Sequence, residues 1–380
     1  MQQAASKIAG EMETTLVLGP RHPAVPAGML ISLSLEPQPG MLGWGSGIKS
    51  AQVETGHGYI GLEESVAGGM EWLQALSLVE GLCGGCAQAN ALAFAQATES
   101  LFNLIVPPRA YYMRMVQVET ERIVSHLLNA AQMMEALSLQ ERGAALLDLR
   151  EKMLQALQAW SGARIAPGLI TIGGVSRNTD ETACRALALA ARNVERSLRA
   201  HVASAINSRD IAARLSGLGT IRVQEAMLGG LRGPTARACG IVIDIRSSYP
   251  VGAYEDEAVT IVIQRAGDAF ARMAVRLLES LESLRVIEQA LDELPPGTVR
   301  ARGNVELLGT SGTATSRVEG PRGEIFCWVK GDPNGITNLH LSPGSYPAVG
   351  VLPGLLTGSK LEDLEPLVLS LDICTGCLER

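Results

Sequence analysis

The middle of the chain carries the hydrophobic periodicity of long amphipathic helices. From Leu62 onward apolar side chains recur at intervals of three and four residues, as between Trp72 and Val79, which places them on one face of a helix. Pro107 and Pro108 suit the first turn of a helix, and Asp180 is a candidate N-cap. The pattern predicts helices over residues 72–82, 87–101, 108–139, 141–162, 180–204 and 266–294.

Both ends of the chain have the pattern of short strands instead. Residues 13–60 are interrupted by prolines and alternate partially over Thr14–Gly19 and Met29–Leu35. The segment Gly303–Ser345 is punctuated by Gly and Pro and includes an expected strand at Glu324–Lys330, and a short helix or turn is expected over Leu361–Leu371. The predicted fold is therefore α+β and mainly helical, with a central bundle of long helices and small β-sheets from the N-terminal and C-terminal segments.

We expect one domain over residues 1–380. Its parts are an N-terminal β segment (13–60), a helical core (62–294) and a C-terminal β and loop segment (303–380), because no stretch of the sequence has the composition of a linker.

Composition restricts the classes of function. Hydrophobic residues make up 47% and charged residues 19% of the chain, which supplies a large core and excludes a disordered protein. The net charge of −7 and the pI near 5.4 argue against a nucleic-acid partner. No run of 18 apolar residues or export signal is visible, so we expect a cytoplasmic protein that reaches a membrane only through partner subunits.

Four of the seven cysteines form two pairs near opposite ends of the chain, Cys83-Gly-Gly-Cys86 and Cys374-Thr-Gly-Cys377. Only a folded core could bring pairs so far apart together. Four thiolates suit zinc, nickel or iron rather than magnesium or calcium. A zinc ribbon usually closes within a few tens of residues, whereas this loop would contain most of the protein. The spacing therefore favours a buried redox or catalytic metal, with a structural zinc site as an alternative.

A thioredoxin-like redox pair is a further alternative, but it requires a strand before the motif, and the residues before Cys83 have a helical pattern. The isolated Cys184, Cys239 and Cys327 are interpreted as buried small hydrophobic residues.

Three polar residues of the longest predicted helix, Glu119, Arg122 and His126, share one helix face. This face is either solvated or part of a proton path. His22 follows a turn-forming proline, and a structural role is one expectation for it.

The segments around both cysteine pairs resemble the nickel-binding signatures of nickel–iron hydrogenase large subunits, R-x-C-G-x-C-x-x-x-H and D-P-C-x-x-C-x-x-H/R. The stretch Gly19-Pro-Arg-His-Pro-Ala24 is similar to the G-P-Q-H-P-A opening of the membrane-bound, energy-converting (group 4) hydrogenases and of the homologous 49-kDa quinone-site subunit of respiratory complex I. Further matches follow in the family's order: Glu121-Arg-Ile-x-x-His-Leu127, Gly233-Pro-Thr-Ala-Arg-Ala238, Asp244-Ile-Arg246 and Glu319-Gly-Pro-Arg-Gly-Glu324. The complex I subunit lacks the four cysteines, so their presence favours the hydrogenase branch.

The resemblance implies a Ni–Fe centre. Cys83 and Cys374 would be terminal ligands of nickel, while Cys86 and Cys377 would bridge nickel to an iron that carries CO and cyanide. Arg322 matches the arginine placed over the open metal site, although an arginine in Pro-Arg-Gly is otherwise an exposed turn.

In the complex I relatives the loop of His22 lines the quinone cavity, so the resemblance implies that place as the alternative to a structural role.

Three more residues receive roles from the resemblance. Asp372 would support the C-terminal loop, Asn90 would hydrogen-bond a bridging sulfur, and Glu121 is the glutamate of the family's E-R-I motif.

The chain also departs from the family pattern. Gly81 replaces an arginine and Asn90 a histidine near the first pair, Ala27 lies near the place of an acidic residue, and Ile373 replaces a proline. These departures affect the proton route and the tuning of the metal more than the metal itself. They keep open a second interpretation, a complex I-type quinone oxidoreductase subunit or non-hydrogenase relative without a working Ni–Fe site.

The leading expectation is the catalytic large subunit of a complex that interconverts H₂ with protons and electrons. No further cysteine set of this chain can hold an iron–sulfur cluster, so electrons would pass to an iron–sulfur small subunit. Membrane subunits of hydrogenase or complex I-like type are the other expected partners. They would place the protein on the cytoplasmic side of the inner membrane.

Overall fold

The computed structural model describes residues 4–8, 11–18, 29–37, 44–58, 60–165, 168–301, 311–378 and 380. The long helices lie where the periodicity predicts them, within a few residues at each end. They are α2 (Trp72–Gly81), α3 (Ala87–Leu101), α4 (Pro108–Ala136), α5 (Gln140–Ser161), α6 (Glu181–Ile206) and α12 (Ala269–Asp292). The predicted mainly helical α+β fold is confirmed.

The ends of these helices follow from local chemistry. Asp180 caps α6 by accepting the backbone N–H of Ala183 at 2.8 Å, as its position predicts. Pro108 occupies the first turn of α4, where its missing N–H costs nothing. The end of α4 comes before the predicted Leu139, because Ser138 takes a left-handed conformation (φ 61°) that reverses the chain.

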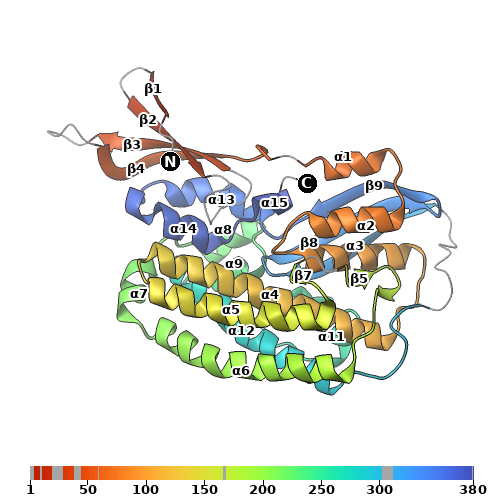
Figure 1. Ribbon diagram of the computed structural model, residues 1–380. Coiled ribbons are helices and arrows are strands. Elements are labelled where there is room, and N and C mark those ends of the chain that lie inside the picture. The colour runs from red at the N-terminus through yellow and green to blue at the C-terminus, as the bar shows by residue number, and fades with distance from the viewer. Residues whose placement is uncertain are drawn as a thin grey trace.

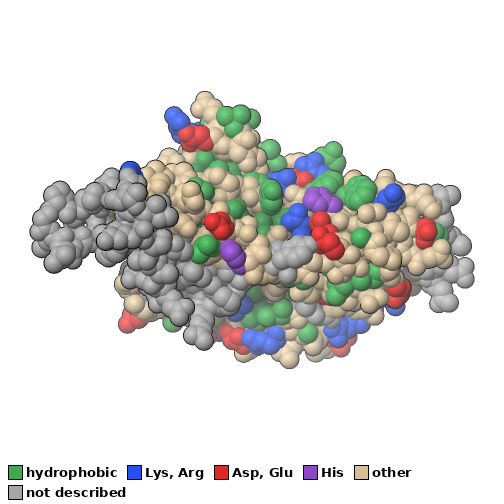
Figure 2. Space-filling view, turned by 90° about the horizontal axis from the view of Figure 1, so that it is seen from above, with side chains coloured by type: hydrophobic (Ala, Val, Ile, Leu, Met, Phe, Trp, Pro, Cys, Tyr) green, Lys and Arg blue, Asp and Glu red, His purple; other side chains and the backbone are tan. Residues whose placement is uncertain are grey.

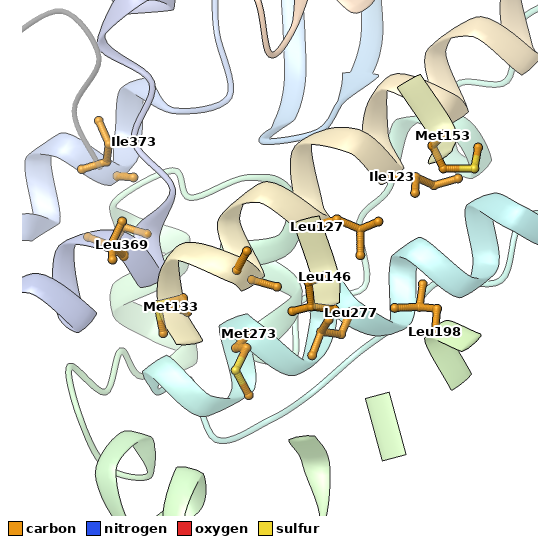
Figure 3. Packing of buried hydrophobic residues seen from close by; sticks show 14 of the residues in the cluster. Ile123, Leu127, Met133, Leu146, Met153, Leu198, Met273, Leu277, Leu369 and Ile373 are labelled. Atoms are coloured by element: carbon orange, nitrogen blue, oxygen red, sulfur yellow. The ribbon is translucent and has the colours of Figure 1, made fainter. Parts of the chain in front are cut away.

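Four helices form the bundle in the lower half of Figure 1, where α4 packs against α5 and α12, and α6 packs against α5 and α12. Their facing side chains form a continuous apolar core (Figure 3): Ile123, Leu127 and Met133 of α4, Leu146 and Met153 of α5, Leu198 of α6, and Met273 and Leu277 of α12. Burying one such side chain contributes about 1.5–3 kcal/mol. This packing makes α4 a rigid support for the polar groups described below.

Two antiparallel sheets come from the ends of the chain, as predicted. The N-terminal sheet has the order β1 (Ala4–Ile8), β2 (Glu11–Leu18), β3 (Met29–Pro37) and β4 (Trp44–Glu54). The C-terminal sheet contains β7 (Gly312–Gly320), β8 (Gly323–Asp332) and β9 (Gly335–Ser342), and its middle strand includes the predicted strand 324–330. A two-stranded hairpin, β5 (Ile170–Thr171) and β6 (Gly174–Val175), turns at the Gly173-Gly174 pair.

Each sheet is covered by helices (Figure 1). Helices α1 (Leu62–Ala67), α2 and α3 pack on the C-terminal sheet, where Trp72 meets Phe102 edge to face with ring centroids 5.3 Å apart. Helix α13 (Tyr346–Leu356) packs on β4, and the N–H of Ile48 donates to the carbonyl of Ser359 at 2.9 Å. Helix α14 (Leu364–Leu371), preceded by the 3₁₀ turn Leu361–Asp363, contacts α4, α12 and α13.

Several elements have no counterpart in the predictions. They are short: β1, α7 (Arg209–Leu215), α8 (Val223–Leu228), α9 (Gly233–Ala238), α10 (Ile245–Ser248), α11 (Ala253–Asp256), α13 and α15 (Thr375–Leu378). Most span about one or two turns, which is too little for a periodic pattern to emerge. His22 and Ala27, which were singled out from the sequence, lie outside the described residues.

The polar face of α4 is not solvated. Glu119, Arg122 and His126 are all fully buried. Glu119 accepts hydrogen bonds from Arg122, Arg246, Tyr254 and Ser283, the last at 2.6 Å. Burial alone would raise the pKa of Glu119, but the two guanidinium groups and the two hydroxyls lower it to about 2.

The same network ties α4 to other elements. The guanidinium of Arg122 donates to the carbonyls of Glu319 and Gly320 on β7, at 2.6 and 2.8 Å. His126 faces Glu279 of α12 at 3.2 Å, and burial lowers the pKa of His126 to about 4, so this histidine is neutral near pH 7. We therefore assign this face to structure, with Glu119 as a fixed anion.

No helix among the described residues is long and apolar enough to cross a membrane. On the face seen in Figure 2, basic and acidic side chains are interspersed among hydrophobic ones, so the part of that face that is drawn in colour carries charges of both signs.

We predict that Glu119→Gln destabilises the fold by about 3–5 kcal/mol, because it leaves the buried guanidinium of Arg122 without its anion and removes one of the two carboxylates that pair with Arg246. The free energy of unfolding of the full chain, measured with denaturant, checks this. The matched control is Glu195→Gln, which breaks an exposed Glu–Arg pair on α6 and should cost about 0.5 kcal/mol or less.

The pH dependence adds a second check. Because the folded pKa of Glu119 is lowered from 4.5 to about 2, its ionised form stabilises the fold fully above pH 4.5, and this contribution is lost as the pH falls toward 2. The stability difference between wild type and Glu119→Gln should therefore shrink over that range. A difference that is independent of pH would contradict the assigned role.

Candidate metal centre

The two cysteine pairs meet in the interior. Cys83 and Cys86 lie in the short loop between α2 and α3, and Cys374 and Cys377 lie at the junction of α14 and α15. All four are buried and form a cluster of their own. The sulfurs of Cys83 and Cys374 are 3.1 Å apart, and those of Cys83, Cys86 and Cys377 lie within 4.8 Å of one another. The predicted convergence is confirmed.

The backbone conformation of the two loops directs the four sulfurs toward one another. Helix α14 ends at Asp372, whose left-handed conformation (φ 53°, ψ 47°) turns the chain into the second pair. The N–H of Cys374 then donates to Oγ of Ser345 at 3.2 Å. In the first pair, the N–H of Gly85 donates to the sulfur of Cys83 at 3.3 Å. Each loop is thus held by contacts that do not involve a metal.

Arg322 reaches the cluster from the turn between β7 and β8. Its Nη1 donates to the sulfur of Cys86 at 3.1 Å, while Nε and Nη2 donate to the carbonyl and the carboxylate of Asp372, both at 3.0 Å. The side chain is only 15% exposed, so the alternative of an ordinary surface turn is wrong. Burial by itself would lower the pKa of Arg322, but Asp372 and the cysteine thiolates raise it well above its usual value.

The turn of Arg322 lies very close to neighbouring backbone. A Cβ on Gly233, which has φ 57°, would lie 2.3 Å from Cα of Gly323, and a Cβ on Gly344 would lie 2.5 Å from the carbonyl oxygen of Arg322. These two glycines allow the backbone of the turn to sit against its neighbours. The guanidinium is therefore fixed both by its own hydrogen bonds and by the packing of its backbone.

Asp372 is held by a second arginine. Nε of Arg276 lies 3.7 Å from Oδ2 of Asp372, and Nη1 of Arg276 donates to the carbonyl of Ser370 at 2.8 Å. Arg272 donates to Oγ of Ser370 at 2.9 and 3.0 Å. Two arginines of α12 therefore hold the end of α14, the element that carries the second cysteine pair, as the expected supporting role of Asp372 requires.

The thiols influence one another's ionisation. Hydrogen bonds with Cys377 and Cys83 lower the pKa of Cys86 to about 5 against the effect of burial, and the charge of Arg322 adds to the lowering. Hydrogen bonds with the other three thiols raise the pKa of Cys377. A thiolate is the form that binds metals. The cluster thus contains a preformed thiolate beside a fixed cation.

The carboxylate of Glu121, which α4 carries, lies at the N-terminus of α3, directly after Cys86. Its Oε1 accepts the N–H of Gln88 at 2.8 Å and its Oε2 that of Ala89 at 3.0 Å, which satisfies two free donors of the first helical turn. Burial raises the pKa of Glu121 to about 7, although these two hydrogen bonds oppose the rise. The pKa of Glu121 therefore lies near neutral pH, unlike that of Glu119.

Asn90 is buried and lies one turn after Cys86 on α3. Its Nδ2 is 4.0 Å from the sulfur of Cys377, the outer limit of an N–H···S contact. The amide points a donor at this sulfur and cannot titrate.

A small cavity borders the cluster. The cavity walls include Cys86, Cys377, Arg322, Ser345 and Pro343. The volume in which the centre of a water-sized molecule fits is about 10 Å³. This is room for one molecule of about the size of water. Two sulfurs and a guanidinium therefore face the same small space.

The donor set fits a soft, redox-active metal group. Four sulfurs converge from two loops, one of them is a thiolate, and the guanidinium of Arg322 lies against Cys86. Sulfur donors alone suit zinc, nickel or iron. A catalytic metal needs an open position that a structural zinc site lacks, and the cavity beside two of the sulfurs leaves space for one small molecule.

Three supports of the site were missed from the sequence: Ser345, Arg276 and Gly344. None carries a local signal, because each acts through a contact with a residue distant in the chain. A buried arginine in the middle of a helix, such as Arg276, could have been suspected from its position among the apolar residues of α12. Of the three isolated cysteines, Cys239 and Cys327 are buried as predicted, whereas Cys184 is only half-buried.

Comparison with known proteins gives a consistent set of relatives. Residues 144–308 match the family described as the 49 Kd subunit of respiratory-chain NADH dehydrogenase. A subunit of the F(420)H(2) dehydrogenase of Methanosarcina mazei is 29% identical, over 97% of this chain and 98% of that protein. The alpha subunit of the membrane-bound hydrogenase of Pyrococcus furiosus is 30% identical, over 95% of this chain and 86% of that protein.

Comparison with solved structures also finds a similar chain. A chain of the membrane-bound sulfane sulfur reductase, an archaeal respiratory membrane complex, superposes with a TM-score of 0.87 at 25% identity, covering 96% of this chain and 98% of that chain. The similarity therefore extends over nearly the whole chain rather than over one motif.

We predict that replacing Cys377 with Ser abolishes metal binding, because a hydroxyl cannot replace a thiolate as a soft ligand. Elemental analysis of the purified protein measures this. Cys184→Ser is the matched control, since Cys184 lies outside the cluster, and it should keep the full metal content. Equal metal content in both variants would refute the four-cysteine centre.

Proposed function

This chain belongs to the family that includes the 49 Kd subunit of respiratory-chain NADH dehydrogenase and the alpha subunit of membrane-bound hydrogenase, and we propose that it is the catalytic large subunit of a group 4 nickel–iron hydrogenase-like complex. The family's named members are subunits of oxidoreductases. The observation that carries the finer proposal is the four-sulfur cluster with Arg322 and a small cavity beside it.

The ligand roles follow the resemblance to hydrogenases. The sulfurs of Cys83, Cys86, Cys374 and Cys377 would together hold a nickel–iron group whose iron carries CO and cyanide. When bound, this group supplies the heterolytic splitting of H₂ and the uptake of its electrons.

The chain's own residues would prepare the site for that chemistry. Arg322 presents a planar cation to the cavity next to Cys86, where a fixed positive charge in a water-poor space stabilises negative charge. Asp372 keeps the guanidinium in one orientation through two hydrogen bonds.

Glu121 and Asn90 would have different roles, one in proton transfer and one in orienting a sulfur. Glu121 would accept or return the proton near neutral pH, because its carboxyl titrates near pH 7 and lies at the helix N-terminus that follows Cys86. Asn90 would orient the sulfur of Cys377 without taking part in proton transfer.

The partners follow from electron flow and from the relatives. Electrons leaving a buried centre need a relay, and the cysteines outside the cluster are isolated in the sequence, so we propose that an iron–sulfur small subunit binds near the cysteine loops. Relatives named as membrane-bound hydrogenase and as part of an archaeal respiratory membrane complex support a peripheral position on membrane subunits, with the cytoplasmic side of the inner membrane as the proposed location.

A second candidate is a complex I-type subunit without a working Ni–Fe site. Asn90 and Gly81 favour it, because both replace residues of the hydrogenase signature, and several relatives are named as subunits of NADH-quinone oxidoreductase. Metal analysis of the intact complex, combined with infrared spectroscopy of CO and cyanide, separates the candidates. Nickel and iron with these bands support the hydrogenase proposal, zinc alone indicates a structural site, and no metal favours the second candidate.

We predict that Arg322→Lys retains nickel and iron but lowers H₂ turnover by at least about a hundredfold, the scale of a lost preorganised donor. Lysine keeps the charge but loses the planar fork that binds Cys86 and Asp372 together. Near wild-type turnover in the metallated variant would contradict the role. Arg317→Lys is the control, since Arg317 pairs with Glu324 on the same sheet, away from the cluster.

We predict that Glu121→Gln lowers H₂ turnover about 10²–10⁴-fold, the range for a positioned proton-transfer group. Metal content should be unchanged, because Glu121 contacts no sulfur in any interaction seen among the described residues. The wild-type profile of turnover against pH should show an inflection near 7 from the raised pKa of Glu121, and the variant should lack it. An inflection that persists in Glu121→Gln assigns the titration to another group.

A further inference from the structure

A second buried carboxylate, Glu80, lies close in sequence to the first cysteine pair and has no role in the proposed function. It lies in the last turn of α2, one turn before Cys83, and is 7% exposed. Among the described residues no Lys, Arg or His lies within ion-pair distance of it, in contrast to Glu119. No guanidinium therefore fixes Glu80 as an anion, and a purely structural reason for burying it is weak.

Gln88 joins Glu80 to Glu121. Its backbone N–H donates to Glu121 at 2.8 Å, and its side-chain Nε2 donates to Oε1 of Glu80 at 2.7 Å. Gln88 is 2% exposed, and its Oε1 is buried without a hydrogen-bond partner among the described residues. An amide oxygen accepts hydrogen bonds, so it can receive one from a protonated carboxyl or from a proton-carrying water between the two acids.

The outer end of this chain of groups reaches the surface. Oε1 of Glu80 also accepts the N–H of Gly168 at 2.9 Å, and Gly168 is exposed. The neighbouring Ile165, whose Cγ2 would lie 3.6 Å from a Cβ added at Gly84 of the first cysteine loop, is 54% exposed. Glu80 therefore lies between the buried Glu121 and solvent.

We propose that Glu80 is the outer proton carrier of the site and that protons pass between Glu121 and solvent through the bridge of Gln88. This inference rests on the proposed function, in which Glu121 accepts the proton. In the outward direction an O–H bond breaks at Glu121 as one forms at Glu80, and Glu80 then releases the proton to water beside Gly168. No electron moves in either transfer.

Infrared spectroscopy on the purified complex tests the route without relying on H₂ turnover. The C=O band of the protonated Glu121 carboxyl is assigned by its loss in Glu121→Gln, and its decay after a rapid pH jump reports proton release. We expect Glu80→Gln to slow this decay by about a hundredfold, the lower part of the range for a positioned proton-transfer group. Glu80→Asp, which keeps a titratable group, should restore part of the rate.

Glu71→Gln is the matched control, since it makes the same change at the exposed start of α2 and should leave the decay unchanged. Gln88→Met provides a second variant, because it removes the amide but keeps the backbone N–H to Glu121, and it should also slow the decay. A wild-type rate in Glu80→Gln or in Gln88→Met, or equal slowing in Glu71→Gln, would overturn the route. Because the band is read whether or not nickel and iron are bound, absence of these metals would refute the proposed function separately.

Discussion

The ion pair between Arg322 and Asp372 is the interaction on which the arrangement of the centre depends. It connects the turn of the C-terminal sheet to the loop of the second cysteine pair, and the third contact of the guanidinium reaches the sulfur of Cys86 in the first pair. Three segments distant in the sequence thus meet at one planar cation. Removing Asp372 would leave the largely buried cation of Arg322 without its carboxylate, which is far more costly than the pair itself is stabilising.

The position of that cation is itself set by a larger buried network. Arg122 of α4 binds the carbonyls of Glu319 and Gly320, directly before the turn of Arg322. The carboxylate of Glu319 in turn accepts from Arg237 at 2.9 Å. Because each buried charge requires its partner, the strand can adopt only the register that satisfies all of these contacts. The helical bundle therefore fixes the turn of Arg322 through charges rather than through apolar packing alone.

The long helices, the two terminal sheets and the meeting of the cysteine pairs could be predicted from the sequence. Helices and strands leave a periodic pattern in neighbouring residues, and the cysteine pairs need only one shared contact, which the chemistry of thiolate ligands suggests. The sequence was not sufficient for Ser345, Arg276 or Glu80. Their roles depend on the tertiary contacts to Cys374, Asp372 and Gln88, which leave no pattern in the residues around them. The short helices between α6 and α12 were missed for a different reason, since one turn cannot show a period.

Glu119 and Glu121 show why residue type and burial alone do not identify a proton carrier. Both are buried carboxylates two positions apart on α4, yet the pKa of Glu119 is lowered to about 2 and that of Glu121 is raised to about 7. Glu119 is surrounded by guanidinium and hydroxyl groups in direct contact, which stabilise its charge. Glu121 accepts two backbone N–H groups, and these together with the more distant charges of Arg122 and Arg322 do not offset its loss of solvation. The helix turns one carboxylate toward the structural network and the other toward the cysteine loop. The weaker compensation of Glu121 brings its pKa near neutral pH, as its proposed role in proton transfer requires.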